Sequence, residues 1–217
     1  MKIACTMTAL LALLSVPTMA QEESKFHFIV NGGLSEPDAP AEFKAGWKDG
    51  SNIGGGIGYR FSPHLSVQGL LNYDRFSVDS EGLLSELDLG PLPDFVDLEV
   101  TGAETSVLSL SGELKASLVG DPNRVSPYVT ICAGVADVKV GDITISTSFL
   151  GLEIEIEIEE TMQGVSETVG MAAVGAGLDI PFGERLGAFV EGRYQSNFTE
   201  GDSMDFSSFH AGIRINR

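Results

Sequence analysis

Three residues have the side chains that nucleophilic catalysis uses. Ser208 and His210 are two positions apart, and His27 is near the other end of the chain. A catalytic Ser–His pair needs about 2.6–3.2 Å between its reacting atoms. Side chains two apart on one strand face are separated by roughly 7 Å, so direct contact within this pair is not expected. The sequence has no nucleophile elbow, zinc spacing or phosphate loop. We therefore expect no enzyme and no cofactor or metal site.

A second set of residues is charged and falls at alternate positions of otherwise apolar segments. An unpaired charge in an enclosed apolar setting is expensive, so opposite charges of such a set should pair. The pairing stays open, because Glu113 and Lys115 can pair either with Glu191 and Arg193 or with Arg60 and Arg214. The predicted polar network is structural, lines the lumen, and consists of Arg60, Asp74, Glu113, Lys115, Glu191, Arg193, His210 and Arg214.

Alternation of apolar and polar residues predicts the strands that must position these charges. In 105–118, Leu108, Leu110 and Leu114 share one parity, while Glu113 and Lys115 share the other. Successive side chains of a strand point to opposite faces, so this strand has one apolar face and one charged face. Eight segments have this pattern, at about 25–33, 52–61, 65–77, 105–118, 127–135, 165–180, 186–195 and 208–216.

The connections between these segments switch between short and long. Short turns are expected near Pro63, Pro122 and Pro181, and long connections over about 34–51, 79–104 and 141–164, with an intermediate one over 199–205. Short turns at one end and long loops at the other are typical of outer-membrane barrels. The segments also reach the ~9–11 residues that a tilted spanning strand needs. A soluble sandwich would show the same parity but not this combination.

Aromatic residues and the N-terminal segment support the same interpretation. Aromatic girdles lie near strand ends, where the chain has Tyr59, Phe61, Tyr73, Tyr128, Tyr194 and Phe198. Residues 1–20 read as a cleaved signal peptide, with Lys2, an apolar run and Ala20 at the expected cleavage site. The run is shorter than the ~20 apolar residues of a spanning helix. Residues 21–217 then form one domain.

The composition excludes some functions. Without Lys2, 12 basic residues stand against 31 acidic ones, a net charge of −19. This balance argues against nucleic-acid binding, which needs a basic surface. The acidity lies mainly in the long connections and is interpreted as a solvated surface. Cys5 leaves with the signal, so Cys132 cannot form an intrachain disulfide and is expected to pack between strands.

The chain resembles the small eight-stranded outer-membrane β-barrels, the OmpX-like and OmpA-like group. The resemblance rests on the glycine-rich run 54–61 before a short turn, on Tyr128, and on the closing run 209–215. It implies an all-β, antiparallel, up-and-down transmembrane barrel in the bacterial outer membrane, with short periplasmic turns and long extracellular loops. It also implies a monomer that contacts outer-membrane lipid and the barrel assembly machinery. These barrels usually end in an aromatic residue, whereas this chain ends in Ile215, Asn216 and Arg217.

Three functions follow from this fold. The first is a structural or surface-interaction protein whose extracellular loops meet a ligand or a host surface. The second is a narrow, gated channel for ions or small solutes, although an eight-stranded lumen is just wide enough for its own side chains to fill. The third is a lipid A-modifying enzyme, because some small barrels use Ser and His near the membrane surface for that reaction.

Two loop segments have patterns of their own. Residues 152–159 alternate Leu or Ile with Glu, which predicts a strand that extends the fifth and sixth segments as a protruding hairpin. Calcium binding and addition of a strand to a partner are open alternatives for this acidic ladder. Residues 83–89 are amphipathic and are expected to form a short helix over the barrel mouth. Ordinary loop packing is the simpler account of both segments.

Overall fold

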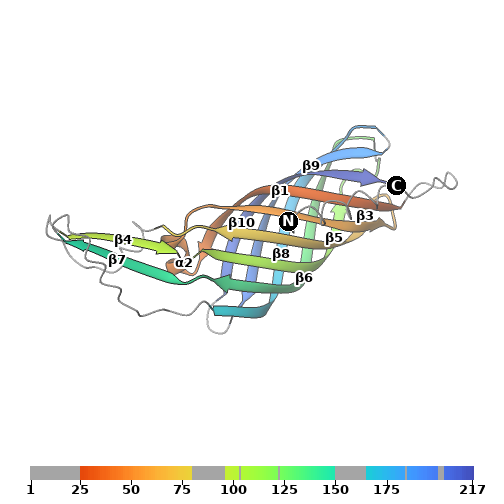
Figure 1. The fold of residues 1–217 in the computed structure, drawn as a ribbon. Coiled ribbons are helices and arrows are strands. Elements are labelled where there is room, and N and C mark those ends of the chain that lie inside the picture. Colours follow the sequence, from red (N-terminus) through yellow and green to blue (C-terminus); the bar gives the residue numbers. More distant parts are fainter. Residues whose placement is uncertain are drawn as a thin grey trace, which may run out of the picture.

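The computed structural model describes residues 25–79, 96–102, 104–121, 123–149, 165–183, 185–199 and 203–217. Eight antiparallel strands close into a barrel in the order β1-β10-β9-β8-β6-β5-β3-β2 (Figure 1). This arrangement confirms the predicted all-β, eight-stranded, up-and-down barrel. The strands are β1 (Phe26–Ala39), β2 (Gly50–Arg60), β3 (Leu65–Phe76), β5 (Thr105–Ser117), β6 (Ser126–Val140), β8 (Val165–Pro181), β9 (Leu186–Phe198) and β10 (Met204–Asn216).

The first and last strands pair with each other and so close the barrel. Val30 of β1 lies opposite Ile213 of β10, and the same antiparallel register runs from His27 to Pro37. Several strands are longer than the alternation predicted: β1 continues to Ala39 and β6 to Val140. Apolar alternation reports only the part of a strand that faces lipid, whereas backbone pairing continues beyond it. The alternation therefore predicts these strands too short at the ends that lead into the long loops.

The outer wall is apolar. Leu34, Leu110 and Phe209 are among the large apolar side chains that the barrel exposes, with 66%, 59% and 69% of their surface accessible. Soluble monomers rarely expose a continuous apolar surface of this kind. Together with full strand closure, this wall excludes the soluble sandwich. In the described part of the chain, no helix has the length and hydropathy needed to cross a membrane.

The predicted aromatic girdle is correct for most of its members and wrong for Tyr128. Phe61, Tyr73, Tyr194 and Phe198 are exposed on the outer wall. Tyr128 is 2% exposed and points into the lumen. The physical reason is parity, because position 128 shares a face with the inward-facing Thr130 and Cys132 of β6.

A second, two-stranded sheet extends the barrel at its long-loop end. It consists of β4 (Val96–Gly102) and β7 (Ile143–Phe149), which we call the arm. Thr105 pairs with Val140 in the barrel, and Gly102 pairs with Ile143 in the arm. The register is thus the same on both sides of the break, so the arm continues the β5–β6 pair. Figure 1 shows it projecting away from the barrel beside α2.

The other loop predictions fall outside this description. The expected strand at 152–159 and the expected helix at 83–89 lie outside the described residues, as do residues 1–24 with the predicted signal peptide. The described helix is α2 (Ala41–Gly46), in the connection between β1 and β2.

Candidate functional site

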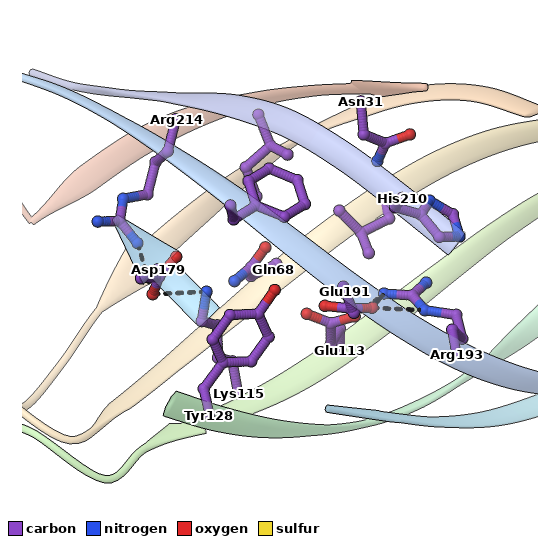
Figure 2. Close-up of a pocket in the computed structure, with 13 residues that line it drawn as sticks. Asn31, Gln68, Glu113, Lys115, Tyr128, Asp179, Glu191, Arg193, His210 and Arg214 are labelled. Carbon is purple, nitrogen blue, oxygen red and sulfur yellow. Dashed lines mark hydrogen bonds and ion pairs between the residues drawn. The ribbon is translucent and has the colours of Figure 1, made fainter. Parts of the chain in front are cut away.

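The lumen contains two ion clusters, and the first is centred on Asp179. The Oδ2 atom of Asp179 lies 2.8 Å from Lys115 Nζ and 2.8 Å from Arg214 Nη1. The three residues come from β8, β5 and β10, and Figure 2 shows them converging in the lumen. Lys115 Nζ also lies 3.5 Å from the centre of the Tyr128 ring, a cation–π distance. We call Lys115, Asp179 and Arg214 the Asp179 cluster; it carries one net positive charge.

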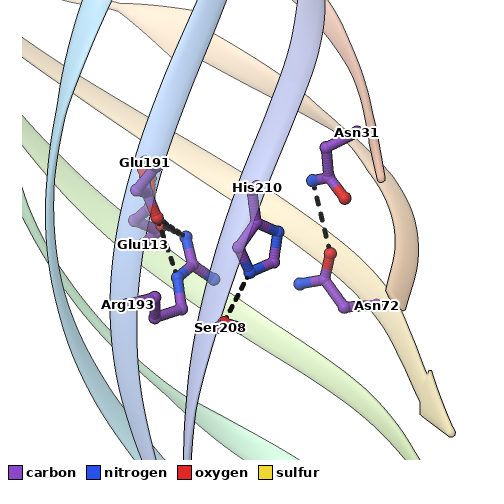
Figure 3. Close-up of polar contacts among 7 residues, drawn as sticks. All are labelled: Asn31, Asn72, Glu113, Glu191, Arg193, Ser208 and His210. Atoms are coloured by element: carbon purple, nitrogen blue, oxygen red, sulfur yellow. Dashed lines mark hydrogen bonds and ion pairs between the residues drawn. The ribbon is translucent and has the colours of Figure 1, made fainter. Parts of the chain in front are cut away.

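The second cluster is centred on Arg193 and carries one net negative charge. Arg193 donates from Nε and Nη2 to Glu191 Oε1, at 2.9 and 2.6 Å, and from Nη2 to Glu113 Oε2 (Figure 3). All three side chains are almost fully buried. We call Glu113, Glu191 and Arg193 the Arg193 cluster. The charges of the two clusters cancel, which limits the penalty of burying them together.

Amides and hydroxyls line the lumen between the Arg193 cluster and the long-loop end. Asp74 accepts a hydrogen bond from Ser35 Oγ at 2.6 Å, and Asn52 Nδ2 donates to the same Ser35 oxygen at 2.9 Å. Asn31 Nδ2 donates to Asn72 Oδ1 at 3.4 Å (Figure 3). These bonds join β1, β2 and β3 and satisfy polar groups that would be costly to bury alone.

Ser208 and His210 are in direct contact, which corrects the expectation from strand spacing. Ser208 Oγ and His210 Nε2 lie 2.7 Å apart (Figure 3). The imidazole is long enough to bridge the spacing of two residues on one strand face. His27 does not join them, because β1 places Gly33, six residues further along, opposite His210. Ser208 and His210 are 5% and 4% exposed, so membrane lipid does not reach the hydroxyl.

The outer end of the lumen is apolar, which the sequence did not predict. Phe76 and Phe206 are 0% and 1% exposed, with ring centres 5.3 Å apart. Phe43 of α2 packs on Phe76 at 5.2 Å and on Trp47 at 5.6 Å. Backbone bonds Lys48 N–Ser77 O and Asp79 N–Gly46 O, both 2.8 Å, fasten this loop to the end of β3. We call this layer the apolar cap; its buried members are Phe43, Phe76, Val107, Cys132, Ala136, Val138, Val169, Met171, Ala173, Met204 and Phe206.

A small cavity lies between the two ion clusters. The cavity between the two ion clusters has a volume of about 20 Å³. A buried water needs roughly 10–15 Å³ on this measure, so the cavity has room for one water molecule. The buried ion clusters occupy the middle of the lumen, and the apolar cap lies toward its long-loop end.

The structure places the eight predicted network residues in different surroundings. Glu113, Glu191 and Arg193 form one cluster, and Lys115 and Arg214 belong to the other. Asp74 bonds to Ser35, His210 to Ser208, and Arg60 is half-buried near the end of β2. Of the two pairings left open by the sequence, the one between Glu113 and Arg193 is present. Lys115 instead pairs with an acidic residue that the sequence analysis did not include.

That missed residue is Asp179, which pairs with both cations of its cluster. A usable signal existed, because Asp179 is a single carboxylate between Leu178 and Ile180, at a position that alternation turns inward. The same signal was available for Tyr128, because alternation places it on the inward face with Thr130 and Cys132. Among the described residues, no group of three or more His, Cys, Asp or Glu is arranged to hold a metal ion.

Solved structures similar to this chain include three outer-membrane or surface proteins of bacteria. Neisserial surface protein A is 12% identical, with a TM-score of 0.56 over 91% of this chain and 100% of that one. Ail of Yersinia pestis is 15% identical, with a TM-score of 0.46 over 89% and 100%. The N-terminal barrel domain of Pseudomonas aeruginosa OprF is 17% identical, with a TM-score of 0.44 over 89% and 100%. No curated protein gives a significant match.

The likeness to Neisserial surface protein A supports a shared fold, and the family itself follows from sequence. A family model described as the outer membrane protein beta-barrel domain matches residues 6–215, which is most of the chain. The closed eight-stranded barrel and its apolar outer wall are what that description requires. The chain therefore belongs to the outer membrane protein beta-barrel domain family and is an outer-membrane protein.

Proposed function

We propose that this protein is a closed membrane anchor that presents its long loops, and above all the arm, to an extracellular ligand or a host surface. The observation that carries the proposal is the contrast between a filled lumen and strands that continue outside the membrane. The cavity between the two ion clusters has room for one water molecule, whereas β5 and β6 pass into the arm without a change of register.

The filled lumen also argues against the channel alternative. A solute would have to break the buried Asp179 and Arg193 clusters and displace Phe43, Phe76 and Phe206. Separating a buried ion pair is costly, because each charge left behind has no partner. Recordings in planar bilayers should show no steady single-channel conductance, and a reproducible open state would favour the channel.

The arm can be removed without touching the barrel, which gives a direct test. Phe76 pairs with Thr105 and Val140 with Val165, so each long connection begins and ends on adjacent strands. A variant with short Gly-Ser linkers in place of residues 80–103 and 142–164 should still fold and show heat-modifiable gel mobility. Cells that carry this variant should lose adhesion to host-cell or matrix surfaces that cells with the full protein bind.

Two outcomes of this assay would overturn the proposal. One is equal adhesion by cells with the full protein and cells with the arm-less variant. The other is adhesion by the full protein no higher than that of cells without it, across the surfaces tested.

The Ser208–His210 contact is a specific observation in favour of the enzyme alternative. A Ser–His hydrogen bond is the first requirement of nucleophilic catalysis, although a third group must orient the His. Lipid A from strains that carry the protein, Ser208→Ala or His210→Ala should be identical. A modification that appears only with the unaltered protein would support the enzyme.

A further inference from the structure

Four cationic residues lie on one half of the barrel rim, at its short-turn end. Lys25 precedes β1, Arg60 ends β2, Arg185 precedes β9 and Arg217 follows β10. These four strands are consecutive in the closed barrel, in the order β2-β1-β10-β9. We call Lys25, Arg60, Arg185 and Arg217 the cationic arc. It lies at the end of the barrel opposite the arm, where Figure 1 marks the C-terminus.

Backbone hydrogen bonds fix the spacing of the cationic arc. Arg60 N donates to Lys25 O at 2.7 Å, and Arg217 N donates at 3.1 Å to the carbonyl of the residue after Lys25. The residue before Arg217 donates to Arg185 O at 2.8 Å. Neighbouring strands lie about 4.8 Å apart, so the arc spans roughly 15 Å over its three strand spacings. Lys25 lies opposite Arg60, and like charges in that position repel each other.

The cationic arc begins where the lipid-facing wall ends. On β1 and β2 the last outward pair is Phe26 and Tyr59, with ring centres 4.9 Å apart, and the arc's members on these strands are the next residues. On β9 and β10 the last outward pair is Leu186 and Ile215, and the arc's members follow within two residues. Aromatic side chains of membrane barrels gather at the two membrane interfaces. The arc is therefore at the level of the lipid headgroups of the periplasmic leaflet.

Charge at this end of the molecule is opposite to that of the rest. Five segments contain the short turns, the strand ends beside them and the residues before β1: 21–28, 57–67, 115–130, 176–190 and 213–217. Together they contain seven Lys or Arg and five Asp or Glu, whereas the rest of residues 21–217 contains five Lys or Arg and 26 Asp or Glu. The short-turn end is therefore basic in a strongly acidic chain.

The arc also differs from the other half of the same rim. There Arg124 pairs with Asp121. Within the described part of the chain, no carboxylate forms an ion pair with Lys25, Arg185 or Arg217. These three cations are positioned to attract an anion from outside the protein.

We propose that the cationic arc binds the phosphate groups of anionic phospholipids in the periplasmic leaflet of the outer membrane. Lys and Arg near a membrane surface attract anionic lipids, and each contributes about a fivefold gain in affinity. Their long stems can lie along apolar surface while the charged group reaches the headgroups. One lipid can thus place its acyl chains on the wall and its phosphate on the arc.

The apolar wall beside the arc is what favours a lipid over a polymer of the periplasm. An anionic polymer would meet the cations without using Phe26, Leu186 or Ile215, which are 51%, 42% and 38% exposed. A lipid uses both surfaces at once. This inference is independent of the arm and goes beyond the proposed surface role, because it assigns a partner to the opposite end of the molecule.

Titration of the purified protein in neutral detergent micelles, followed by native mass spectrometry, tests the proposal. The two probes are phosphatidylglycerol, which is anionic, and phosphatidylcholine, which is zwitterionic. The parent protein should bind phosphatidylglycerol more tightly than phosphatidylcholine. The triple variant Lys25→Gln, Arg185→Gln, Arg217→Gln should bind phosphatidylglycerol about 100-fold more weakly, at about fivefold for each cation, and phosphatidylcholine as before. Heat-modifiable gel mobility shows that the variant is folded.

A matched control removes three cations from the other end of the molecule. Lys44, Arg75 and Lys139 are exposed and lie near the long loops. The variant Lys44→Gln, Arg75→Gln, Lys139→Gln should keep the parent's preference for phosphatidylglycerol. Equal loss in both triple variants would overturn the proposal, because the lipid would then respond to net charge alone.

Three other results would also overturn the proposal. One is equal binding of the two lipids by the parent protein. Another is retention of the protein by purified peptidoglycan that depends on the arc, with no preference between the lipids, because the arc would then serve the cell wall. The third is loss of the preference in the arm-less variant. Loss of adhesion without loss of lipid preference, or the reverse, separates the proposed function from this inference.

Discussion

Lys115 and Asp179 meet inside the barrel with their charged atoms 2.8 Å apart, although β6 separates their strands. The same carboxylate oxygen also lies 2.8 Å from Arg214. One acidic side chain therefore compensates two buried cations from distant parts of the chain. Removing one member of a buried ion pair is far more harmful than removing an exposed one.

Asp179→Asn tests this dependence. The variant leaves Lys115 and Arg214 buried with no carboxylate between them, and it should lose about 3–5 kcal/mol of unfolding free energy. Urea unfolding in phospholipid vesicles, followed by gel mobility, measures the loss. Asp137→Asn is the control, because Asp137 pairs with Lys139 on the outside, and it should unfold like the parent protein. Equal urea unfolding midpoints for the two variants would contradict the idea that Asp179 stabilises the barrel by compensating Lys115 and Arg214.

Arg193 has the opposite arrangement, with one cation between two carboxylates. Arg193→Met should destabilise the barrel by about 3–5 kcal/mol, because Glu113 and Glu191 remain buried and unpaired. Replacing all three members with apolar residues of similar volume should restore the midpoint or raise it. The same urea assay compares the single and triple variants. If the triple variant is less stable to urea than Arg193→Met, the Arg193 cluster stabilises the fold by more than the compensation of its own charges.

Phe43 should control how firmly α2 covers the barrel mouth. Phe43→Ala removes the ring that packs on Phe76 and Trp47, and it should lower the local opening free energy by roughly 3 kcal/mol. Hydrogen exchange of residues 41–46 should then be ~100-fold faster, while exchange in the barrel strands stays unchanged. Lys44→Ala, an exposed position on the same helix, is the control. Unchanged exchange in Phe43→Ala would show that the backbone bonds alone hold the helix.

Gly177 of β8 lies against the ring of Tyr128 and the backbone of β9. A Cβ there would lie 2.6 Å from Tyr128 Cζ and would also meet the Val190 carbonyl. Gly177→Ala should cost about 1–3 kcal/mol as an overpacked site. Gly112→Ala is the matched control, because nothing lies within 4 Å of its added Cβ, and it should be neutral or slightly stabilising. Urea unfolding midpoints measure the difference, and equal midpoints would show that both the Tyr128 ring and the Val190 carbonyl move aside at no cost.

The fold was largely readable from the chain because a membrane barrel imposes two simple rules. Lipid requires an apolar side chain at every second position, which is why positions such as Leu110 and Phe209 identified the outer wall. The turn residues near Pro63, Pro122 and Pro181 marked the short-turn end. Those rules hold along each strand and need no knowledge of its neighbours. They end at the membrane boundary, which is why β1 and β6 were predicted too short.

The site was less readable because its contacts join strands that are distant in sequence. Parity showed that Glu113, Lys115 and Arg193 point inward, but not which of them meet. That choice depends on strand order and on the stagger between strands, which bring Lys115 to Asp179 and Glu113 to Arg193. Side-chain reach mattered too, since the His210 ring spans a spacing that Cα geometry alone would leave open.

By itself, then, the sequence determined the closed barrel, its lipid-facing residues, its acidic loops and the inward set of charges, because alternation and charge are local properties of the chain. The tertiary structure alone decided that the outer lumen is apolar, with Phe43 brought from a loop onto Phe76 and Phe206. It also decided that β4 and β7 continue the β5–β6 register into an arm. Both features depend on contacts between segments that are distant in sequence, and those contacts are determined by the packing of the whole chain.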